Sequence, residues 1–385
     1  MHQQLLKLEL TGFRTYETLS VPLEAEAVFF IGQNGAGKTS ILEAIGVASV
    51  LRSFRGGNDR DMIRFGNPFY SVTVDYSSAG KNSRQHVAFG RDPSLTQQKD
   101  ARRMSLNGEK INRSSEFIGR LQTVFFSPDD IAIVDSGPAE RRRFFDILLS
   151  SLFPGYYENL QNYQRTLKLR SALFKSNSKP DNVYLSSLDK ELAKAGNVIL
   201  GRRISFIKKF EPAFQKYVAL ISGSRDQWRI VYRPTILAQD ERNYFQELEK
   251  NRSKDLRLRQ TTCGIHRDQI AFLPEPAGSF EEQNPDLSRI ASQGQKRTAA
   301  LALKMAQYEL TREVRGERPV LLIDDVLNEL DSTRRKHFIH FLHEIGQALI
   351  TTTDVDSIAA YLAERKDIRT LIYKIEDNHI TLTNP

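Results

Sequence analysis

The stretch that most constrains the fold is "GQNGAGKTS", residues 32–40, because it joins two segments of different periodicity. The preceding "AVFFIG" is a short apolar run typical of a buried strand, and the following "ILEAIGVASVL" has helical spacing. A glycine-rich loop between a strand and a helix lets backbone N–H groups approach phosphates closely. The sequence therefore predicts an α/β nucleotide-binding domain.

This loop has the form of a complete Walker A motif, Gly32-x4-Gly37-Lys38-Thr39. Lys38 is expected to reach the β- and γ-phosphates of ATP, Thr39 to ligate Mg²⁺ and Ser40 to add a phosphate contact. A chance glycine-rich turn is the alternative, and the flanking strand and helix argue against it. The predicted ATP-binding residues of the loop are Gly32, Gln33, Asn34, Gly35, Ala36, Gly37, Lys38, Thr39 and Ser40.

A second motif, "VLLIDD", ends at Asp325. Its four apolar residues predict a buried strand, and open α/β sheets bind ligands at the carboxyl ends of their strands. Asp324 is expected to hold Mg²⁺ directly or through water, and Asp325 to orient or deprotonate the attacking water. The alternative is a pair of carboxylates that caps the next turn.

A third motif, "ASQGQKRTAALALK", starts at Ala291 and is expected to open a helix. Free N–H groups and the dipole make a helix N-terminus attractive to phosphate, and Ser292 can cap the helix as well as bind a phosphate. The stretch resembles the signature motif of the ABC ATPase superfamily, with Ala291 and Gln293 as departures. That resemblance implies that Ser292, Gly294 and Gln295 contact a nucleotide on a second copy, with Ser292 in a catalytic role.

Two further stretches resemble elements of the same superfamily. "NELD" resembles the D-loop, which implies that Asp331 joins Ser292 and Gly294 at the dimer interface. "ITTTD" (350–354) takes the place of the switch strand, but it has threonines where most members have a histidine. The switch residue is therefore left open.

The order of these motifs predicts an α/β fold of the ABC-type P-loop ATPase head, a mixed sheet flanked by helices and built from both chain ends. Residues 1–137 are expected to form its N-terminal part and residues 288–385 its C-terminal part. Residues 138–287 are predicted to form an inserted, mainly helical lobe. A helical stripe runs from Leu188 to Ile221, and Pro212 is expected to kink or divide it.

Positive charge is concentrated in the middle of the chain. Residues 141–259 hold 24 Lys/Arg and 12 Asp/Glu, whereas the rest holds 31 and 35, within a formal net charge of +8. This distribution suggests a polyanionic partner such as nucleic acid, although a solvated basic surface is an equal alternative. No apolar run reaches the roughly 18 residues that span a bilayer, so no membrane contact is expected. The single cysteine fits a reducing, cytoplasmic location.

Several longer segments resemble the RecF family of bacterial recombination-mediator ATPases, which are related to SMC heads. They include "LELTGFRTY", "FFSPDDI", "GPAERRRFFD", "NYQRTLKLRSALF" and "GIHRDQIAF", in addition to the three motifs above. The resemblance extends almost end to end. It departs from the family pattern at Cys263-Gly264-Ile265, where a Gly-Pro pair is usual, and at Asn328 in the D-loop.

The resemblance implies a slow, DNA-stimulated ATPase that dimerises when it binds ATP. It implies a location in the cytoplasm, at the nucleoid. The implied substrates are double-stranded DNA, single-strand gaps and junctions. The implied partners are RecR and RecO, which help to load RecA. The resemblance also places Arg14 near the nucleotide. The candidate DNA contacts in the basic middle segment are Arg141, Arg142, Arg202, Arg203, Lys208 and Lys209.

Three other functions fit the sequence less well. A structural DNA tether of the SMC type needs a long coiled coil, and about 150 inserted residues broken by proline argue against it. A transporter ATPase subunit fits poorly with the basic lobe and the missing switch histidine. An ATPase-coupled nuclease would need an additional acidic metal-binding domain.

Overall fold

The computed structural model describes residues 2–91, 100–176, 181–275, 285–342, 345–353 and 368–383, with the backbone alone at 328–329. The chain divides into two compact units. Unit 1 comprises Met1–Asp130, Leu220–Ser222 and Leu301–Pro385, and unit 2 comprises Ile131–Ala219 and Gly223–Ala300. Unit 1 therefore contains both ends of the chain, and the predicted α/β head is confirmed. The exact boundaries expected at residues 138 and 288 stay a prediction.

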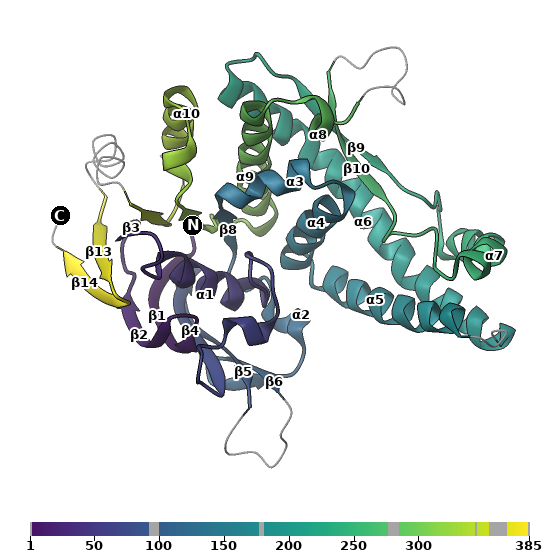
Figure 1. Ribbon diagram of the computed structural model, residues 1–385, viewed down its shortest axis with the longest axis horizontal. Helices are drawn as coiled ribbons and strands as arrows, with labels where there is room; N and C mark the ends of the chain where they lie inside the picture. The colour runs from purple at the N-terminus through teal and green to yellow at the C-terminus, as the bar shows by residue number, and fades with distance from the viewer. Residues whose placement is uncertain are drawn as a thin grey trace. The chain divides into compact units, whose positions relative to one another are not determined.

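One sheet of unit 1 is mixed, with strand order β14-β13-β3-β12-β11-β8 (Figure 1). All neighbouring pairs are parallel except β13 and β14. Its strands are β3 (Ala27–Ile31), β8 (Thr123–Phe126), β11 (Val320–Asp324), β12 (Ala348–Thr352), β13 (Thr370–Glu376) and β14 (His379–Thr383). Every residue of β11 and β12 is buried, as expected for interior strands of a parallel sheet.

The other sheet of unit 1 is antiparallel, with strand order β2-β1-β4-β5-β6-β7. Its strands are β1 (Gln4–Phe13), β2 (Tyr16–Pro22), β4 (Phe69–Ser78), β5 (Lys81–Gly90), β6 (Ala101–Leu106) and β7 (Glu109–Ile111). Buried and less buried residues alternate along β4, so one face of that strand lines the core. Helix α1 (Lys38–Val50) packs against β4 and also contacts β11 and β12, which places its N-terminus near the parallel sheet.

Unit 1 also holds short elements around the sheets and the longer α10. These are η1 (Asp59–Met62), α2 (Ser114–Phe117), η2 (Pro128–Asp130), η4 (Val326–Glu329) and α10 (Ser332–Leu342).

Unit 2 is mainly helical, as predicted. Its helices are α3 (Ile131–Asp135), α4 (Pro138–Leu152), α5 (Pro154–Lys175), α6 (Asn182–Ser222), α7 (Glu241–Leu258) and α8 (Leu287–Ile290). A two-stranded antiparallel sheet joins β9 (Trp228–Arg233) to β10 (Gln269–Pro274). Helix α9 (Gln293–Arg315) begins in unit 2 and continues into unit 1.

Helix α6 is 41 residues long and contains Pro212, so the division predicted there does not occur. Figure 1 shows α5 and α6 side by side. Arg170 of α5 joins them by binding Asp189 of α6 at 2.6 Å, and it binds Asp255 of α7 at 2.7 Å; all three side chains are fully buried. This helical lobe is thus held by an ion-pair network as well as by apolar packing. Among the described residues, no helix is long and apolar enough to cross a membrane.

Candidate functional site

The predicted phosphate-binding loop connects β3 to α1. At two of its glycines, neighbouring atoms leave no room for a side chain. Gly37 has a φ of +102°, and an added Cβ would lie 2.7 Å from the hydroxyl of Tyr16. A Cβ at Gly32 would lie 2.4 Å from the carbonyl oxygen of Ile375. Glycine at these positions lets the loop adopt its turn between the two sheets of unit 1. The middle of the loop, residues 33–35, is exposed.

Lys38 opens α1 and is 4% exposed. Its ammonium group donates hydrogen bonds to the carbonyl oxygens of Gly32 at 2.8 Å and Gln33 at 3.1 Å. The same nitrogen lies 3.9 Å from Oδ2 of Asp325. The structure thus holds the lysine of the first motif beside a carboxylate of the second, although 287 residues separate them in the sequence.

Strand order explains why the two motifs meet. Strand β12 lies between β3, which carries the loop, and β11, which ends at Asp324. In the parallel register Asp324 is level with Thr351, which is level with Phe30 near the end of β3. The carboxyl ends of the three strands therefore form one edge, where open α/β sheets bind ligands.

At this edge Asp324 accepts two hydrogen bonds on the same oxygen. The hydroxyl of Thr39 donates at 2.8 Å and that of Thr351 at 2.7 Å. Burial raises the pKa of the Asp324 carboxyl above its usual value, while the two hydroxyl hydrogen bonds oppose the rise. Thr351 is itself 1% exposed, so it serves as a buried partner of the carboxylate.

Thr39 and Asp324 have the chemistry of a magnesium site. Mg²⁺ prefers oxygen ligands and takes only one or two from the protein when phosphates and waters supply the others. A hydroxyl and a carboxylate oxygen 2.8 Å apart fit that preference. These two residues would hold the ion, which would neutralise charge on the phosphates of a bound nucleotide.

Asp325 has an unusual backbone conformation, with a φ of +49°. Its amide donates to the hydroxyl of Thr351 at 3.1 Å, which fixes the turn after β11. Its buried Oδ1 atom has no hydrogen-bond partner within the part of the chain that the structure describes. A carboxylate held next to Lys38 with one oxygen unsatisfied is suited to accept a proton or a hydrogen bond from water.

The predicted signature motif opens α9 with a capping box in unit 2. The backbone N–H of Gln295 donates to the hydroxyl oxygen of Ser292 at 3.2 Å, and the amide of Ser292 donates to Oε1 of Gln295 at 3.0 Å. Ser292 is exposed and Gly294 is half-buried. The predicted helix therefore begins at this motif, and the residues at its start, Ser292 and Gln293, are exposed.

Asp331, the predicted D-loop residue, caps α10. Its carboxylate accepts the backbone N–H of Arg334 at 2.9 Å and also pairs with the Arg334 guanidinium. These contacts lower the pKa of the Asp331 carboxyl. Its side chain is 49% exposed, and its place at a dimer interface stays a prediction.

Arg14, expected near the nucleotide, is bound to α1. Its guanidinium group donates to both carboxylate oxygens of Glu43, at 2.9 and 2.5 Å, and to the carbonyl of Asp61 at 2.5 Å. Glu43 is fully buried. Arg14 therefore fixes the turn between β1 and β2 against α1, and its nucleotide contact stays a prediction.

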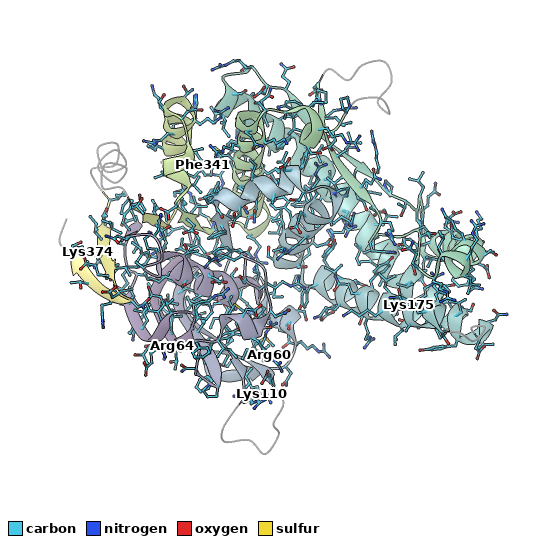
Figure 2. All side chains as sticks on the ribbon, viewed as in Figure 1. Arg60, Arg64, Lys110, Lys175, Phe341 and Lys374 are labelled. Atoms are coloured by element: carbon cyan, nitrogen blue, oxygen red, sulfur yellow. The ribbon has the colours of Figure 1, made fainter. Side chains whose placement is uncertain are left out.

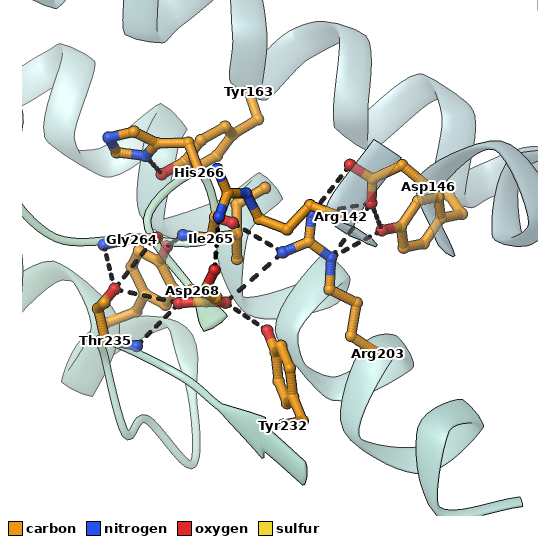
Figure 3. A network of polar contacts seen from close by, with 12 residues as sticks. Arg142, Asp146, Tyr163, Arg203, Tyr232, Thr235, Gly264, Ile265, His266 and Asp268 are labelled. Atoms are coloured by element: carbon orange, nitrogen blue, oxygen red, sulfur yellow. Dashed lines mark hydrogen bonds and ion pairs between the residues drawn. The ribbon is translucent and has the colours of Figure 1, made fainter. Parts of the chain in front are cut away.

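Two of the predicted DNA contacts are wrong, because Arg141 and Arg203 lie inside unit 2. Arg141 is 2% exposed and binds both oxygens of Asp286 at 2.6 Å. Arg203 is 1% exposed and binds Asp146 at 2.8 Å and Asp268 at 3.5 Å (Figure 3). A buried arginine tied to carboxylates is not available to DNA phosphates.

The other predicted DNA contacts differ in exposure. Arg142 is half-buried and donates to the backbone carbonyl of Asp268 at 2.7 Å (Figure 3). Arg202, Lys208 and Lys209 are exposed on α6. These three exposed residues are the ones that can meet a polyanion.

Sequence reasoning missed several residues that position this machinery. Thr351 lies in the stretch whose switch residue the sequence left open, and its hydrogen bond to Asp324 was not predicted. Glu43 and Asp226, which hold Arg14 and Gln295, lie 29 and 69 residues away from their partners. No spacing signal links residues so far apart, so only the fold reveals these contacts.

Known proteins resemble this chain in sequence and in fold. The family described as "RecF/RecN/SMC N terminal domain" matches residues 4–370. A relative in Leptospira interrogans, "DNA replication and repair protein RecF", is 38% identical over 360 residues, which are 94% of each chain. A protein of the same name in Streptococcus suis is 36% identical over 91% of this chain and 93% of its own.

A solved structure supports the same assignment. "Structure of the recombination mediator protein RecF-ATPrS in RecFOR pathway" is 27% identical in sequence and superimposes with a TM-score of 0.86 over 100% of this chain and 99% of the other. The resemblance predicted from the sequence is confirmed. The chain therefore belongs to the RecF family, DNA replication and repair proteins of the ABC-type ATPase superfamily.

Proposed function

We propose that the protein is a DNA-binding ATPase of replication and recombinational repair whose ATP-bound form is a homodimer. The observation that carries this proposal is the junction of the two phosphate motifs. Thr39 of the loop and Asp324 of the buried strand lie 2.8 Å apart at the carboxyl edge of a parallel sheet, with Lys38 beside Asp325.

Each of these residues has one task in hydrolysis. Lys38 leaves the loop carbonyls that it now binds and reaches the β- and γ-phosphates. Thr39 and Asp324 would hold Mg²⁺, whose charge would stabilise the phosphates. Asp325 orients the attacking water through Oδ1, for which no described residue is a hydrogen-bond partner. The Thr351 hydroxyl holds the Asp324 carboxylate and the Asp325 backbone in place by hydrogen bonds.

A second copy of the chain completes the site. Ser292 and the free N–H groups of α9 form an exposed, positively polarised helix end, which is a binding site for a phosphate group. In a two-fold dimer each signature motif would face the nucleotide on the other copy's loop. The interface then contains two nucleotides and forms only when they are present.

The proposed DNA surface is a basic stripe on α6. At 100° per residue its exposed cations lie within an arc of about 120°, and they extend over about 39 Å. They are Lys190, Lys194, Arg202, Lys208, Lys209 and Lys216. One exposed acid, Glu191, interrupts the arc. A stripe of this length can follow a phosphate backbone, and its use would make binding fall steeply with salt.

Arg60 and Arg64 of unit 1 are weaker candidates, because a carboxylate lies beside each of them. Figure 2 shows Arg60 and Arg64 projecting from the sheet region of unit 1. Arg60 binds Asp100 at 2.5 Å, and Arg64 lies 3.6 Å from Glu17. The α6 stripe therefore remains the proposed surface.

Membership of the RecF family supports the biological context. We propose that the dimer acts on gapped and double-stranded DNA and works with RecR and RecO to help load RecA. An SMC-type tether is not favoured, because α5 and α6 are 22 and 41 residues long and contribute to a compact unit.

Molecular mass in solution tests the proposal. Asp325→Asn, which should bind ATP without hydrolysing it, is measured without nucleotide and with Mg-ATP. We expect a monomer that becomes a dimer only with ATP, whereas Lys38→Ala should stay monomeric in both conditions. A species that binds ATP and stays monomeric would refute the shared nucleotide site.

A further inference from the structure

The signature glutamine uses both ends of its side-chain amide. Oε1 of Gln295 accepts the backbone N–H of Ser292 at 3.0 Å, and Nε2 donates to Oδ1 of Asp226 at 2.8 Å. All three residues belong to unit 2. Asp226 lies between the end of α6 at Ser222 and the start of β9 at Trp228.

The chemistry of Asp226 decides which way this amide points. An ionised carboxylate only accepts hydrogen bonds, so the NH₂ end of Gln295 must face it. The oxygen end is then left to face the amide of Ser292 and close the capping box. Without the carboxylate the amide could turn over, and its NH₂ group would meet the N–H of Ser292.

The orientation of Gln295 in turn sets what Ser292 offers to a ligand. The hydroxyl oxygen of Ser292 already accepts the backbone N–H of Gln295, so the hydroxyl hydrogen is left to donate outward. Ser292 is exposed, whereas Gln295 and Asp226 are half-buried behind it. The half-buried contact therefore holds an exposed hydrogen-bond donor in place.

A neighbouring contact shows that the first turn of α9 is fixed by tertiary partners. Lys296, the next residue, binds Asp135 of α3 at 2.5 Å. The side chain of Asp135 is 45% exposed, so solvent screens this pair. The Asp226 contact acts on Gln295, the residue that closes the capping box.

We infer that Asp226 is a positioning residue for the signature motif, which acts through Gln295 to present Ser292 to the nucleotide of a second copy. This inference rests on the proposed ATP-dependent dimer. Asp226 lies outside every nucleotide motif. Its replacement should weaken dimer assembly and should leave ATP binding by the loop of the same chain unchanged.

The test measures dimer dissociation constants in Mg-ATP in the Asp325→Asn background. Asp226→Ala should weaken each signature contact about tenfold, which corresponds to about 1.4 kcal/mol. Because a two-fold dimer contains the contact twice, its dissociation constant should rise about a hundredfold. The affinity of the monomer for a fluorescent ATP analogue should change less than twofold.

A double-mutant cycle separates this role from general stabilisation. If Asp226 acts through Gln295, the dimer of Asp226→Ala/Gln295→Ala should be no weaker than that of Gln295→Ala alone. Additive losses would overturn the inference, as would a dimer of Asp226→Ala as tight as its parent.

Two further variants keep the result interpretable. Asp226→Asn retains a hydrogen-bond acceptor but lets both side-chain amides turn over, so we expect an intermediate loss of dimer affinity. If Asp226→Ala does not fold, the same measurement is made on Asp226→Asn. Asp377→Asn, in the exposed turn between β13 and β14, removes the same charge and should dimerise normally. If the parent itself fails to dimerise with ATP, the proposed function is refuted, independently of Asp226.

Discussion

Arg202 and Arg203 are adjacent on α6, and the structure predicts different effects for their replacement by alanine. Arg203 is 1% exposed, whereas Arg202 is exposed and its guanidinium lies 4.3 Å above the ring of Phe153. Arg203→Ala should destabilise unit 2, and Arg202→Ala should weaken DNA binding. Because the two residues are adjacent, each variant is a control for the other: both remove one arginine from the same turn of α6.

The magnitude follows from what Arg203 binds. It donates to Asp146, Tyr156 and the carbonyl of Ile265, and it lies 3.5 Å from Asp268, which is itself 1% exposed. Removing one partner of a buried ion pair costs about 3–5 kcal/mol. Unit 2 has about 170 residues, a size at which each kcal/mol lowers the melting temperature by about 2–4 °C. Arg203→Ala should therefore lower it by roughly 6–20 °C.

The exposed neighbour should behave differently. An exposed cation–π contact is worth about 0.5–1 kcal/mol, so Arg202→Ala should lower the melting temperature of unit 2 by no more than about 4 °C. If Arg202 contacts one phosphate, its loss should reduce the salt dependence of DNA binding by about 0.9 in the log–log slope.

The chain contains a single tryptophan, which provides the assay. Trp228 lies in β9 of unit 2 and is 6% exposed, so its fluorescence reports the unfolding of that unit. Urea and thermal unfolding are followed at this probe, and DNA binding is measured across a salt series. An Arg203→Ala variant within 1 kcal/mol of the parent protein would refute the assigned role of the buried ion pair.

Four other changes have defined outcomes. Lys38→Ala should abolish ATP binding in a filter or fluorescence assay, and retained binding would contradict its role in the loop. Ser292→Arg should bind ATP normally yet fail to dimerise by mass measurement. Thr351→Val removes a hydrogen bond from Asp324, so the Mg²⁺ concentration that half-saturates ATPase activity should rise about tenfold, and an unchanged value would count against the assignment. Burial lowers the pKa of His266 from 6.5 to about 4, so the unfolded chain takes up the proton first and stability falls as the pH drops from 6.5 to 4. His266→Gln should remove up to about 3 kcal/mol of that loss, measured by urea unfolding at each pH.

The nucleotide motifs were predictable because their chemistry is local. The loop around Lys38 needs glycines at fixed spacing, and the strand before Asp324 needs a continuous apolar run. Each pattern is contained in fewer than ten residues, so the sequence shows it directly. The capping box of Ser292 and Gln295 is local in the same sense, since its two residues lie three positions apart.

The sequence by itself determined the two phosphate motifs, the helix start at Ser292 and the basic character of the middle segment. Only the tertiary structure decided that Thr351 lies between the motifs, because strand order sets which carboxyl ends meet. It also decided that Arg203 is buried whereas Arg202 is exposed, because residues one position apart on a helix point about 100° away from each other. The helical pattern shows which residues share a face, but the partners packed against each face determine whether a charge is paired inside the lobe or free to meet DNA.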